Sequence, residues 1–453
     1  RPDPALAERH EREVFPLLRR RHLFAEVDDF LLYDLFTPDG HVDENVYAYS
    51  NRRGDERALV VYHNRYAEAR GWVRTSVAYA DLAAGGALVQ RTLGEGLGLH
   101  DEAEAYTIFR DHVTGLEYIR NSHELCERGL YVELGAYRYH VFLDFYEVWD
   151  DASRRYGHIA AHLNGRGVPS VEEAARELAV WPVLEPFRRL ANADTLGRLM
   201  PPATPDDALL RRVGEDVAHL LRAVRQRVGG EGEVDEVTRA IVGRLRATLG
   251  LPAALDALPA DLSPANAWAA EEARAALAAG APAWGTLLGW ALVHDLGRAA
   301  GAEGAEVRSR AWLDEWLLGS ALAGALREMG VAEEEARRAV ERIRVLVAHP
   351  AWLTGGPVDP RDAVQTLSGW LQDEGTQRLI GLHRFDEGLW VHRESWEEFL
   401  RWMLLASSVE TLARAARGER DATAWMASRA ALLDALRRAV EAAGYRLDRV
   451  LEA

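Results

Sequence analysis

The sequence predicts an α+β protein in which an antiparallel β-sandwich domain is followed by a large all-α helical domain. Residues 45–79 contain three short segments with the apolar pattern of β-strands, separated by turn-forming residues. After Asp150 the pattern changes to amphipathic helices, several of which carry start signals. We therefore expect residues 1–27 to form a helix, residues 28–150 the β-sandwich and residues 151–453 the helical domain.

The N-terminal helix is indicated by the spacing of its apolar residues. Val14, Leu17 and Leu18 recur at helical spacing, and Pro16 among them is expected to kink the helix or to begin a turn. The mostly apolar residues 30–34 (FLLYD) follow, and in the resemblance described below they correspond to the first strand of a β-domain.

Residues 45–79 predict three consecutive strands joined by hairpins. In residues 46–50 small side chains alternate with tyrosines, whereas residues 58–62 form a continuous apolar run, which is typical of a strand buried on both faces. Between these two segments, Gly54 can adopt the positive φ that a tight turn requires. Residues 72–79 place a β-branched or aromatic residue at every second position and predict the third strand.

The rest of the β-domain is described by four segments. Within residues 129–150 (GLYVELGAYRYHVFLDFYEVWD), Val141, Leu143 and Phe145 alternate with Phe142, Asp144 and Tyr146, which is typical of a β-strand. Residues 80–98 are rich in alanine and glycine, and we expect them to form a loop. Residues 101–109 and 115–121 fit either strands or a short helix.

The chain after Asp150 predicts an irregular helical bundle, since it contains no fixed-period repeat. Thr204, Ser263 and Asp359 each precede a proline, and a capping side chain before proline marks a helix start. The first of these helices has one apolar stripe, formed by Leu209, Leu210, Val213, Val217, Leu220, Leu221, Val224 and Val228. Further helices are expected at residues 234–249, 265–279, 284–299, 306–329, 332–348, 361–372, 394–416 and 422–443.

Residues 45–79 (NVYAYSNRRGDERALVVYHNRYAEARGWVRTSVAY) resemble the small β-domain that follows the catalytic barrel in α-amylase-type enzymes, glycoside hydrolase family 13. Residues 13–24 (EVFPLLRRRHLF) resemble the end of the last barrel helix, and residues 129–150 resemble the closing hairpin of that β-domain. The resemblance covers about the first third of the chain. It implies a C-terminal part of an enzyme that acts on α-glucan-type carbohydrate, with the catalytic barrel domain as the partner that the β-sandwich stabilises.

The catalytic motifs of that family are missing from the chain. Retaining glycoside cleavage needs two carboxylates in different environments, one to attack and one to deliver a proton. The family's nucleophile lies in a G-x-R-x-D motif, which does not occur here, and no run of strand–helix units precedes the β-domain. We therefore assign no catalytic residue and expect the barrel to lie outside this chain. The start at Arg1, without methionine, suggests a fragment of a longer protein.

Composition excludes several classes of protein. The formal net charge of −17 argues against a nucleic-acid partner, because phosphate contacts need a concentrated basic surface. All 54 basic residues are arginine, which excludes P-loop NTPases, kinases of the usual pattern and Schiff-base chemistry. Cys126 is the single cysteine, so no intrachain disulfide can form. No apolar stretch is long enough to span a bilayer, and we expect a cytoplasmic protein with no cofactor and no membrane partner.

A metal-dependent phosphohydrolase is a second interpretation, which depends on His294 and Asp295. Within residues 290–298 (WALVHDLGR) this pair resembles the helix signature of HD-type phosphohydrolases, which bind metals through dispersed His and Asp residues. The resemblance implies further ligands, for which His219 and His349 are available. However, one His-Asp pair arises easily by chance in a chain with 15 histidines. We favour packing roles for these residues and assign no metal site.

Aromatic residues are candidates for sugar binding, because rings stack on the C–H faces of sugars. One group, in residues 379–399, is expected instead to anchor an interhelical loop on the core: Phe385, Leu389, Trp390 and Trp396. A second group lies in the β-domain, where cross-strand packing is the usual role: Tyr47, Tyr49, Tyr62, Trp72, Tyr137 and Tyr139. Core-facing helical spacing is shown by Trp312, Trp316, Trp370 and Trp402.

These patterns leave the ligand-binding residues and the oligomeric state open. Carbohydrate is the candidate ligand, but no carbohydrate-binding residue is assigned, because a sequence does not tell which ring faces solvent. A third interpretation is a structural or interaction protein without catalysis, which would be supported by an exposed apolar patch on the helical domain.

Overall fold

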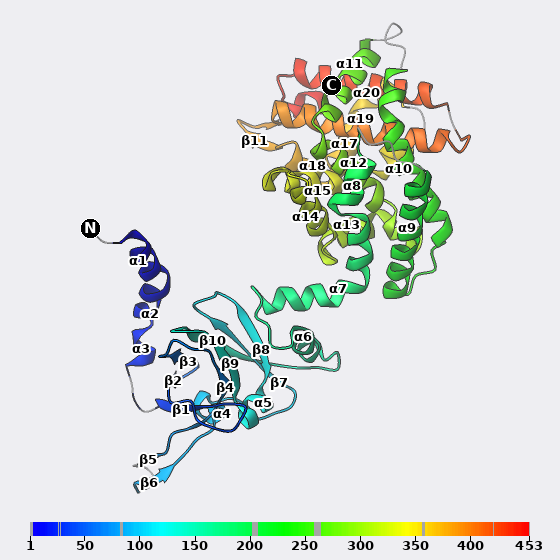
Figure 1. Cartoon of the computed structure of the whole chain (residues 1–453). Helices are drawn as coiled ribbons and strands as arrows, with labels where there is room; N and C mark the ends of the chain where they lie inside the picture. The colour runs from blue at the N-terminus through cyan, green and yellow to red at the C-terminus, as the bar shows by residue number, and fades with distance from the viewer. Residues whose placement is uncertain are drawn as a thin grey trace. The chain divides into compact units, whose positions relative to one another are not determined.

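A computed structural model describes residues 3–25, 27, 29–81, 85–201, 207–257, 264–355, 358–419 and 421–452 (Figure 1). Contacts divide the chain into two compact units, Arg1–Ala179 and Val180–Ala453. The first is built around a curled antiparallel sheet and the second is helical, so the predicted α+β class is confirmed.

The chain begins with short helical segments where one helix was expected. They are α1 (Pro4–Arg9), a π-helical turn (His10–Val14), α2 (Phe15–Arg19) and α3 (Arg21–Phe24). Pro16 lies in the first turn of α2, where its missing N–H group is tolerated. The π-helical turn is tied to the sheet by Glu13, whose carboxylate accepts hydrogen bonds from Tyr139 Oη at 2.5 Å and from Arg9 Nε at 2.9 Å.

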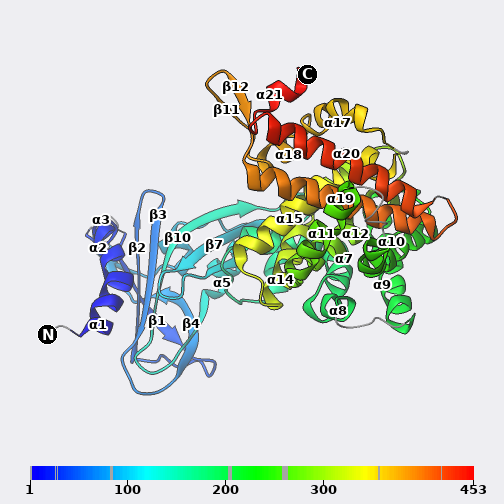
Figure 2. The same cartoon turned by 90° about the horizontal axis from the view of Figure 1, so that it is seen from above.

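Eight strands form the sheet, and several of them run side by side in Figure 2. The expected strands at residues 30–34 and 45–79 are present as β1 (Leu31–Phe36), β2 (Val46–Arg53), β3 (Glu56–His63) and β4 (Ala69–Ser76). The hairpin between β2 and β3 is confirmed, but the one expected between β3 and β4 is wrong, because β4 pairs with β1 and β9. The others are β7 (Ala105–Asp111), β8 (Glu117–Asn121), β9 (Leu130–Leu134) and β10 (Tyr139–Trp149). The order across the sheet is β8-β7-β10-β3-β2-β1-β4-β9, so β8 and β9 are its two edges. Asp28, at the predicted start of the β-domain, lies outside the described residues.

The predicted closing hairpin of residues 129–150 is wrong, although both of its strands exist. β9 pairs with β4, placing Leu130 opposite Val73, whereas β10 lies between β3 and β7. Apolar alternation identifies a strand and its buried face but carries no information about its partner. The hairpin is what the resemblance to the α-amylase-type β-domain implies, whereas the chain crosses from the edge strand β9 to a position between β7 and β3.

One curled sheet encloses the core of this unit in place of two stacked sheets. The register shifts in two strand pairs: between β1 and β4 the extra residue lies on β4, between Val73 and Ser76, and between β10 and β7 it lies on β10, between Leu143 and Tyr146. Such bulges bend a strand. The curl directs one face of every strand into a common core. This core includes Leu31, Leu35, Val46, Ala48, Leu59, Val61, Val73, Phe109, Leu130, Val132, Phe142 and Phe145.

Residues 80–98, expected to be a loop, contain regular structure. β5 (Tyr79–Asp81) pairs with β6 (Ala87–Val89), and α4 (Leu93–Leu97) follows. Thr92 and Glu95 form a capping box at the start of α4, and their spacing of three residues is the sequence pattern of that motif. The buried leucines of α4, together with α5 (Ser122–Arg128), help to close the core.

Helix α6 (Arg155–Leu163) and the first half of α7 (Val171–Leu190) pack with the sheet. Ile159, Leu163 and Val171 bury the second face of β7 and β8 by packing with Ile108 and Ile119. Without these helices that apolar face would meet water. The compact unit therefore extends to Ala179, beyond the boundary at Asp150 that the sequence suggested.

The helical unit contains most of the predicted helices. Its described elements are α8 (Ala193–Leu199), α9 (Asp207–Val228), α10 (Val234–Asp256), α11 (Pro264–Ala278), α12 (Ala281–Val293), α13 (Ala305–Glu315), α14 (Leu318–Glu328), α15 (Glu333–Val347), α16 (Pro350–Thr354), α17 (Ala363–Trp370), α18 (Glu374–Leu379), β11 (His383–Phe385), β12 (Gly388–Trp390), α19 (Arg393–Ala415), α20 (Ala422–Ala442) and α21 (Leu447–Leu451). The predicted caps Thr204 and Ser263 lie outside the described residues. Asp359 caps a short 3₁₀ turn before α17.

The single helix predicted at residues 306–329 is divided into α13 and α14. Leu317, between them, has a φ of 58°, a left-handed conformation that is rare for a bulky residue. Trp312 and Trp316 stack with their ring centres 4.0 Å apart, and both are buried. Apolar residues continue at helical spacing across this break, which is why the pattern predicted one helix.

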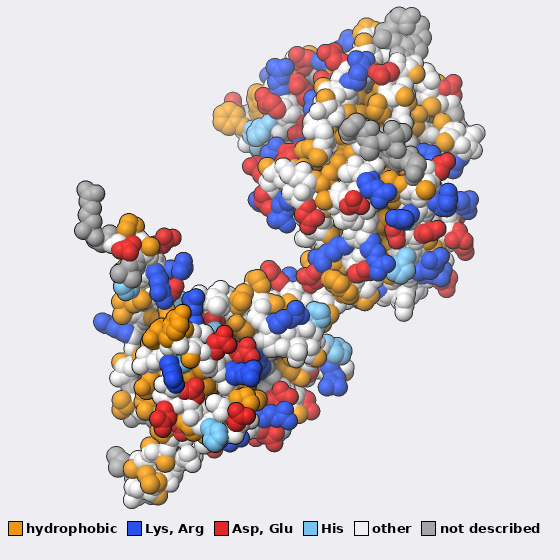
Figure 3. All heavy atoms as spheres, viewed as in Figure 1, with side chains coloured by type: hydrophobic (Ala, Val, Ile, Leu, Met, Phe, Trp, Pro, Cys, Tyr) orange, Lys and Arg blue, Asp and Glu red, His pale blue; other side chains and the backbone are white. Residues whose placement is uncertain are grey.

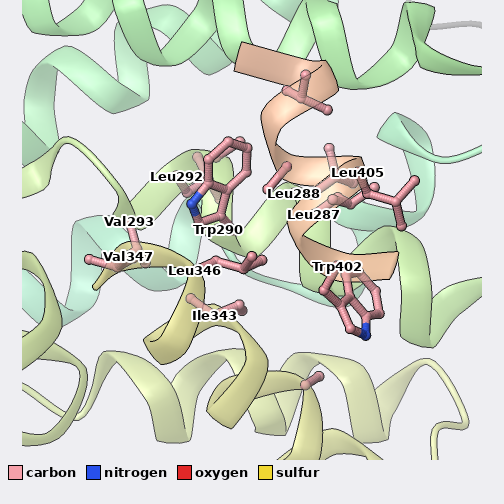
Figure 4. Close-up of a cluster of buried hydrophobic side chains, with 14 of the residues drawn as sticks. Leu287, Leu288, Trp290, Leu292, Val293, Ile343, Leu346, Val347, Trp402 and Leu405 are labelled. Atoms are coloured by element: carbon pink, nitrogen blue, oxygen red, sulfur yellow. The ribbon is translucent and has the colours of Figure 1, made fainter. Parts of the chain in front are cut away.

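The core of the helical unit is built from leucine, valine and tryptophan side chains. Figure 4 shows Leu287, Leu288 and Trp290 of α12 beside Ile343 and Leu346 of α15, and all of them are buried. The four tryptophans assigned to packing are also buried, as their spacing predicted: Trp312, Trp316, Trp370 and Trp402.

The surface in Figure 3 carries acidic and basic side chains interspersed with one another. The exposed large apolar residues of the helical unit that the structure describes lie on different elements: Trp181, Val228, Val307 and Phe385. Within the described ranges, no single helix meets the length and apolarity needed to cross a membrane, whereas α11 and residues 281–299, bent by 103°, meet them only as a pair.

Candidate ligand-binding site

A cavity of about 1070 Å³ lies between the two edge strands of the curled sheet. Residues 118–121 of β8 line one side and residues 130–133 of β9 line the other. Helix α6, the loop at residues 164–167 and inward-facing residues of β7 and β10 complete its wall. The sheet curls without pairing β8 to β9, and the cavity occupies the gap that remains.

Aromatic rings form the inner wall of the cavity. Phe109 stacks on Tyr118 with ring centres 5.7 Å apart, and Phe142 meets Phe109 edge-on at 5.2 Å. These residues occupy the core-facing positions of β7, β8 and β10. Phe109 and Phe142 are buried whereas Tyr118 is half-buried, so Tyr118 is the most exposed of these three side chains.

A histidine on β10 lies beside this aromatic wall. The ring of His140 stacks on Phe142 at 5.2 Å, and its Nδ1 hydrogen-bonds to the fully buried carboxylate of Asp111. Burial alone would raise the pKa of Asp111, but hydrogen bonds from His140, Thr114 and the Val113 N–H group outweigh it, so this pKa is lowered. Asp111 is therefore an ionised carboxylate that fixes the orientation of His140.

Arg120 projects from β8 into the cavity wall. Its Nη1 donates to the carbonyl oxygen of Ile119 at 2.8 Å, and its Nη2 donates to that of Gly165 at 2.9 Å. The guanidinium carbon lies 5.7 Å from the centre of the Tyr118 ring, within cation–π distance. Burial lowers the pKa of Arg120, although an arginine remains charged at physiological pH.

The loop at residues 164–167 packs closely on these side chains. Asn164 and Gly165 have φ values of 45° and 86°, a left-handed conformation that turns the chain directly after α6. Gly167 then approaches so closely that a Cβ atom there would lie 2.7 Å from Cζ of Tyr118. Glycine at this position therefore allows the loop to hold the tyrosine ring in place.

The outer part of the cavity is lined by charged and titratable side chains. Arg154, His158 and Arg166 contribute from α6 and its flanks, Glu124 from α5 and Glu133 from β9, and all are exposed. The described lining residues include no Ser, Thr or Cys side chain that would serve as a nucleophile. The arrangement suits the binding of a polar ligand that has an apolar face.

The β-domain aromatics considered from sequence do not line this cavity. Tyr47 and Tyr137 are exposed at 54% and 55%, but both lie elsewhere on the sheet. Trp72 forms a cross-strand pair with Tyr131, with ring centres 4.9 Å apart, and Tyr49 packs on Phe30 at 5.7 Å. Tyr62 and Tyr139 are cross-strand partners on β3 and β10.

Sequence reasoning missed the residues that do line the cavity, notably Tyr118, Arg120 and His140. Residues 115–121 fit either a strand or a short helix, because their alternating aromatic and charged residues do not form a clear apolar face. Recognising β8 as a strand would have placed Tyr118 and Arg120 on the same face.

Comparisons with known proteins identify no relative: no protein-family model matches the chain, and no curated protein or solved structure matches it. The resemblance to α-amylase-type enzymes therefore depends on the segments quoted above.

His294 and Asp295 lie in a buried ion-pair cluster in the helical unit. Asp295 Oδ2 accepts a hydrogen bond from Arg244 Nη2 at 3.0 Å, and Arg244 also binds Glu410 at 2.9 Å. Burial alone would raise the pKa of Asp295, but Arg244 and the neighbouring Arg298 lower it to about 2. The carboxylate is thus engaged by arginine side chains.

The other histidines of the phosphohydrolase interpretation are not gathered around Asp295. His349 is buried and hydrogen-bonds through Nε2 to Thr376 Oγ1 at 2.7 Å, whereas His219 is exposed on α9. His294 packs against Trp290 with ring centres 5.3 Å apart. Among the described residues, no group of three or more His, Cys, Asp or Glu side chains is placed to hold a metal ion. The burial and the contacts of His294, Asp295 and His349 agree with packing roles for these residues.

The aromatic group in residues 379–399 is divided between core and surface. Trp396 is fully buried, whereas Phe385 is 68% exposed on the hairpin of β11 and β12. Trp390 Nε1 donates to the carbonyl oxygen of Phe385 at 2.9 Å, which stabilises the hairpin. Trp396 therefore anchors this segment on the core, as expected, and Phe385 does not.

Proposed function

We propose that the N-terminal unit is a non-catalytic carbohydrate-binding module of an α-amylase-like glycoside hydrolase, and that it binds its ligand in the cavity between β8 and β9. The observation that carries this proposal is the combination of the half-buried Tyr118 side chain with the hydrogen-bonding side chains of Arg120, His140 and Asn164 on one wall. Sugars are held by a ring stacked on their C–H face and by polar groups that bind their hydroxyls.

The size of the cavity supports a short oligosaccharide as the ligand. Ligand cavities commonly measure about 300–1,000 Å³. The volume of about 1070 Å³ lies just above that range, so the cavity has room for more than one sugar ring.

The carboxylates of the cavity support binding without cleavage. Glu124 and Glu133 both line it, and both are exposed. A glycosidase acid is normally kept protonated by an apolar, buried environment. Neither side chain has that environment, so we expect no bond cleavage on this chain.

The partner in this proposal is the catalytic barrel domain of the parent enzyme. Support comes from the N-terminal helical segment, where Val14, Phe15 and Leu18 are exposed at 36%, 49% and 59%. Neighbouring apolar side chains exposed to water are characteristic of surfaces that contact another domain.

Titration calorimetry of the full chain with maltotriose tests the proposal. We expect saturable binding, and we expect Tyr118→Leu to weaken it about tenfold, because the substitution removes the stacking ring but keeps an apolar side chain. Tyr47→Leu is the matched control, since Tyr47 is an exposed strand tyrosine outside the cavity.

Two results would contradict the proposal. If wild type and Tyr118→Leu bound maltotriose with equal affinity, the cavity would not be the binding site. If neither bound maltotriose, the carbohydrate function would be contradicted. Release of new reducing ends from maltotriose during incubation would contradict the non-catalytic assignment.

A further inference from the structure

The charge of the cavity is opposite in sign to that of the chain. Three arginines line it, Arg120, Arg154 and Arg166, against the two glutamates Glu124 and Glu133. The whole chain has 54 basic and 71 acidic residues. A local excess of arginine in an acidic protein attracts anions to that place.

The three cavity arginines also lack carboxylate partners. Among the described residues, none of the three forms an ion pair, whereas arginines elsewhere in the same unit do, such as Arg57 with Glu147 and Arg110 with Glu117. An arginine whose charge is not balanced within the protein is available to a ligand that carries the opposite charge.

Arg120 is the arginine for which the missing partner matters most. Its guanidinium is half-buried against Tyr118 and the loop at residues 164–167, and its two hydrogen bonds go to neutral carbonyl groups. Removing a cation from water is unfavourable unless an anion compensates it. Burial lowers the pKa of Arg120, and the attraction of Glu124, which forms no ion pair with it, offsets this effect only in part.

Arg120 is also held ready for binding. The hydrogen bonds to Ile119 and Gly165 restrict the guanidinium, and they leave N–H groups unused. A planar guanidinium in a fixed orientation binds carboxylate or phosphate oxygens in pairs with little further loss of entropy. Arg154 and Arg166 are exposed near the mouth, where they add long-range attraction.

We propose that the cavity recognises an anionic sugar, with Arg120 binding its negatively charged group and Tyr118 stacking on its ring. The charged group is a carboxylate or a phosphate, which share the oxygen geometry that a guanidinium binds. This inference rests on the proposed function, because it specifies which class of carbohydrate the module takes.

Calorimetric titration of the full chain with four probes tests the inference: glucose, glucuronate, glucose 6-phosphate and inorganic phosphate. We expect at least one of the two anionic sugars to bind about tenfold more tightly than glucose, since a charged hydrogen-bonded pair is stronger than a neutral one. The tighter of the two identifies the charged group. We also expect added salt to reduce this preference.

Three variants separate a specific site from a general charge effect. Arg120→Lys keeps the charge but loses the paired donors, and it should reduce the preference for the anionic sugar about fivefold. Arg154→Ala should reduce the preference for the anionic sugar less than Arg120→Lys does, because the Arg154 side chain is exposed. Arg128→Ala, which removes an exposed arginine of α5 outside the cavity, should leave it unchanged.

The outcomes distinguish this inference from the proposed function. Equal binding of glucose and both anionic sugars would overturn the inference and leave the carbohydrate function standing. Binding of inorganic phosphate but of neither anionic sugar would overturn the inference and indicate an anion site at Arg120 instead. Binding of none of the four probes would also overturn the inference, whereas the carbohydrate function is decided separately by the titration with maltotriose.

Discussion

Nδ1 of His140 lies 3.0 Å from Oδ2 of Asp111, and the two residues connect the middle strand β10 to the end of β7. Because the pKa of Asp111 is lowered, its carboxylate is ionised and acts only as an acceptor. Nδ1 of His140 must therefore carry the proton and donate it. This assignment leaves Nε2 as the ring nitrogen that is open to a ligand in the cavity.

Asp111→Asn should destabilise the N-terminal unit by about 1–3 kcal/mol at pH 7, because it weakens hydrogen bonds to a buried carboxylate. A lowered folded-state pKa contributes stability above the unfolded value of about 3.9, and this contribution is lost as the pH falls further. The difference in unfolding free energy between wild type and Asp111→Asn should therefore become smaller below about pH 4. Thermal unfolding at several pH values measures it, with the exposed turn residue Asp55→Asn as control. A difference that stays constant down to pH 2 would contradict this.

Arg244→Met should destabilise the helical unit by about 3–5 kcal/mol, because it leaves the carboxylates of Asp295 and Glu410 buried without their cation. Arg246→Met is the matched control on the same helix. Its ion pair with Asp207 is exposed, so the loss should be at most about 0.5 kcal/mol. Urea unfolding measures both, and similar losses for the two variants would count against a structural role for the cluster.

His294→Leu should make the helical unit less sensitive to acid. Burial and the nearby Arg244 lower the pKa of His294 to about 4, so the folded state keeps the imidazole neutral while the unfolded chain takes up a proton near pH 6.5. Wild type should therefore lose stability as the pH falls from 6.5 to 4, by up to about 3 kcal/mol from this residue. Urea midpoints at pH 7.5, 6 and 5 measure the effect.

The control for His294→Leu is His219→Gln, since His219 is exposed on α9 and should not change the pH dependence. Some acid sensitivity should remain in His294→Leu, because burial also lowers the pKa of His349 to about 4. A variant whose stability falls between pH 6.5 and 4 as steeply as wild type would show that His294 does not contribute.

Cys126 should react slowly with thiol reagents in the folded protein. Burial raises the pKa of its thiol to about 11, so at pH 8 the reactive thiolate is scarce. Labelling with iodoacetamide at pH 8 should be at least about a hundredfold slower in the native state than in urea. Equal rates in the two states would mean that the thiol is accessible.

The sequence predicted local structure better than it predicted pairing. Alternation in residues 46–50 and the apolar run at residues 58–62 were enough to identify β2 and β3, because each strand buries a defined face. Neither pattern shows that β9 pairs with β4 rather than with β10, since partner choice depends on the whole sheet. The spacing of apolar residues likewise does not predict the left-handed conformation of Leu317, which divides α13 from α14.

The residues that line the cavity could not be predicted from the sequence for a related reason. Tyr118, His140 and Gly167 come from three separate segments, and only the curl of the sheet brings them to one wall. By contrast, His294 and Asp295 are both buried, in agreement with the packing roles that the sequence favoured for them.

The bulges of β4 and β10 bend the sheet whose two edge strands line the cavity. A bulge inserts or removes one residue and so changes the bend of its strand. Related chains would be able to take longer or shorter ligands by gaining or losing a single residue at these two points, with every contacting side chain preserved. Selectivity for ligand length and selectivity for ligand charge would then evolve independently in this domain.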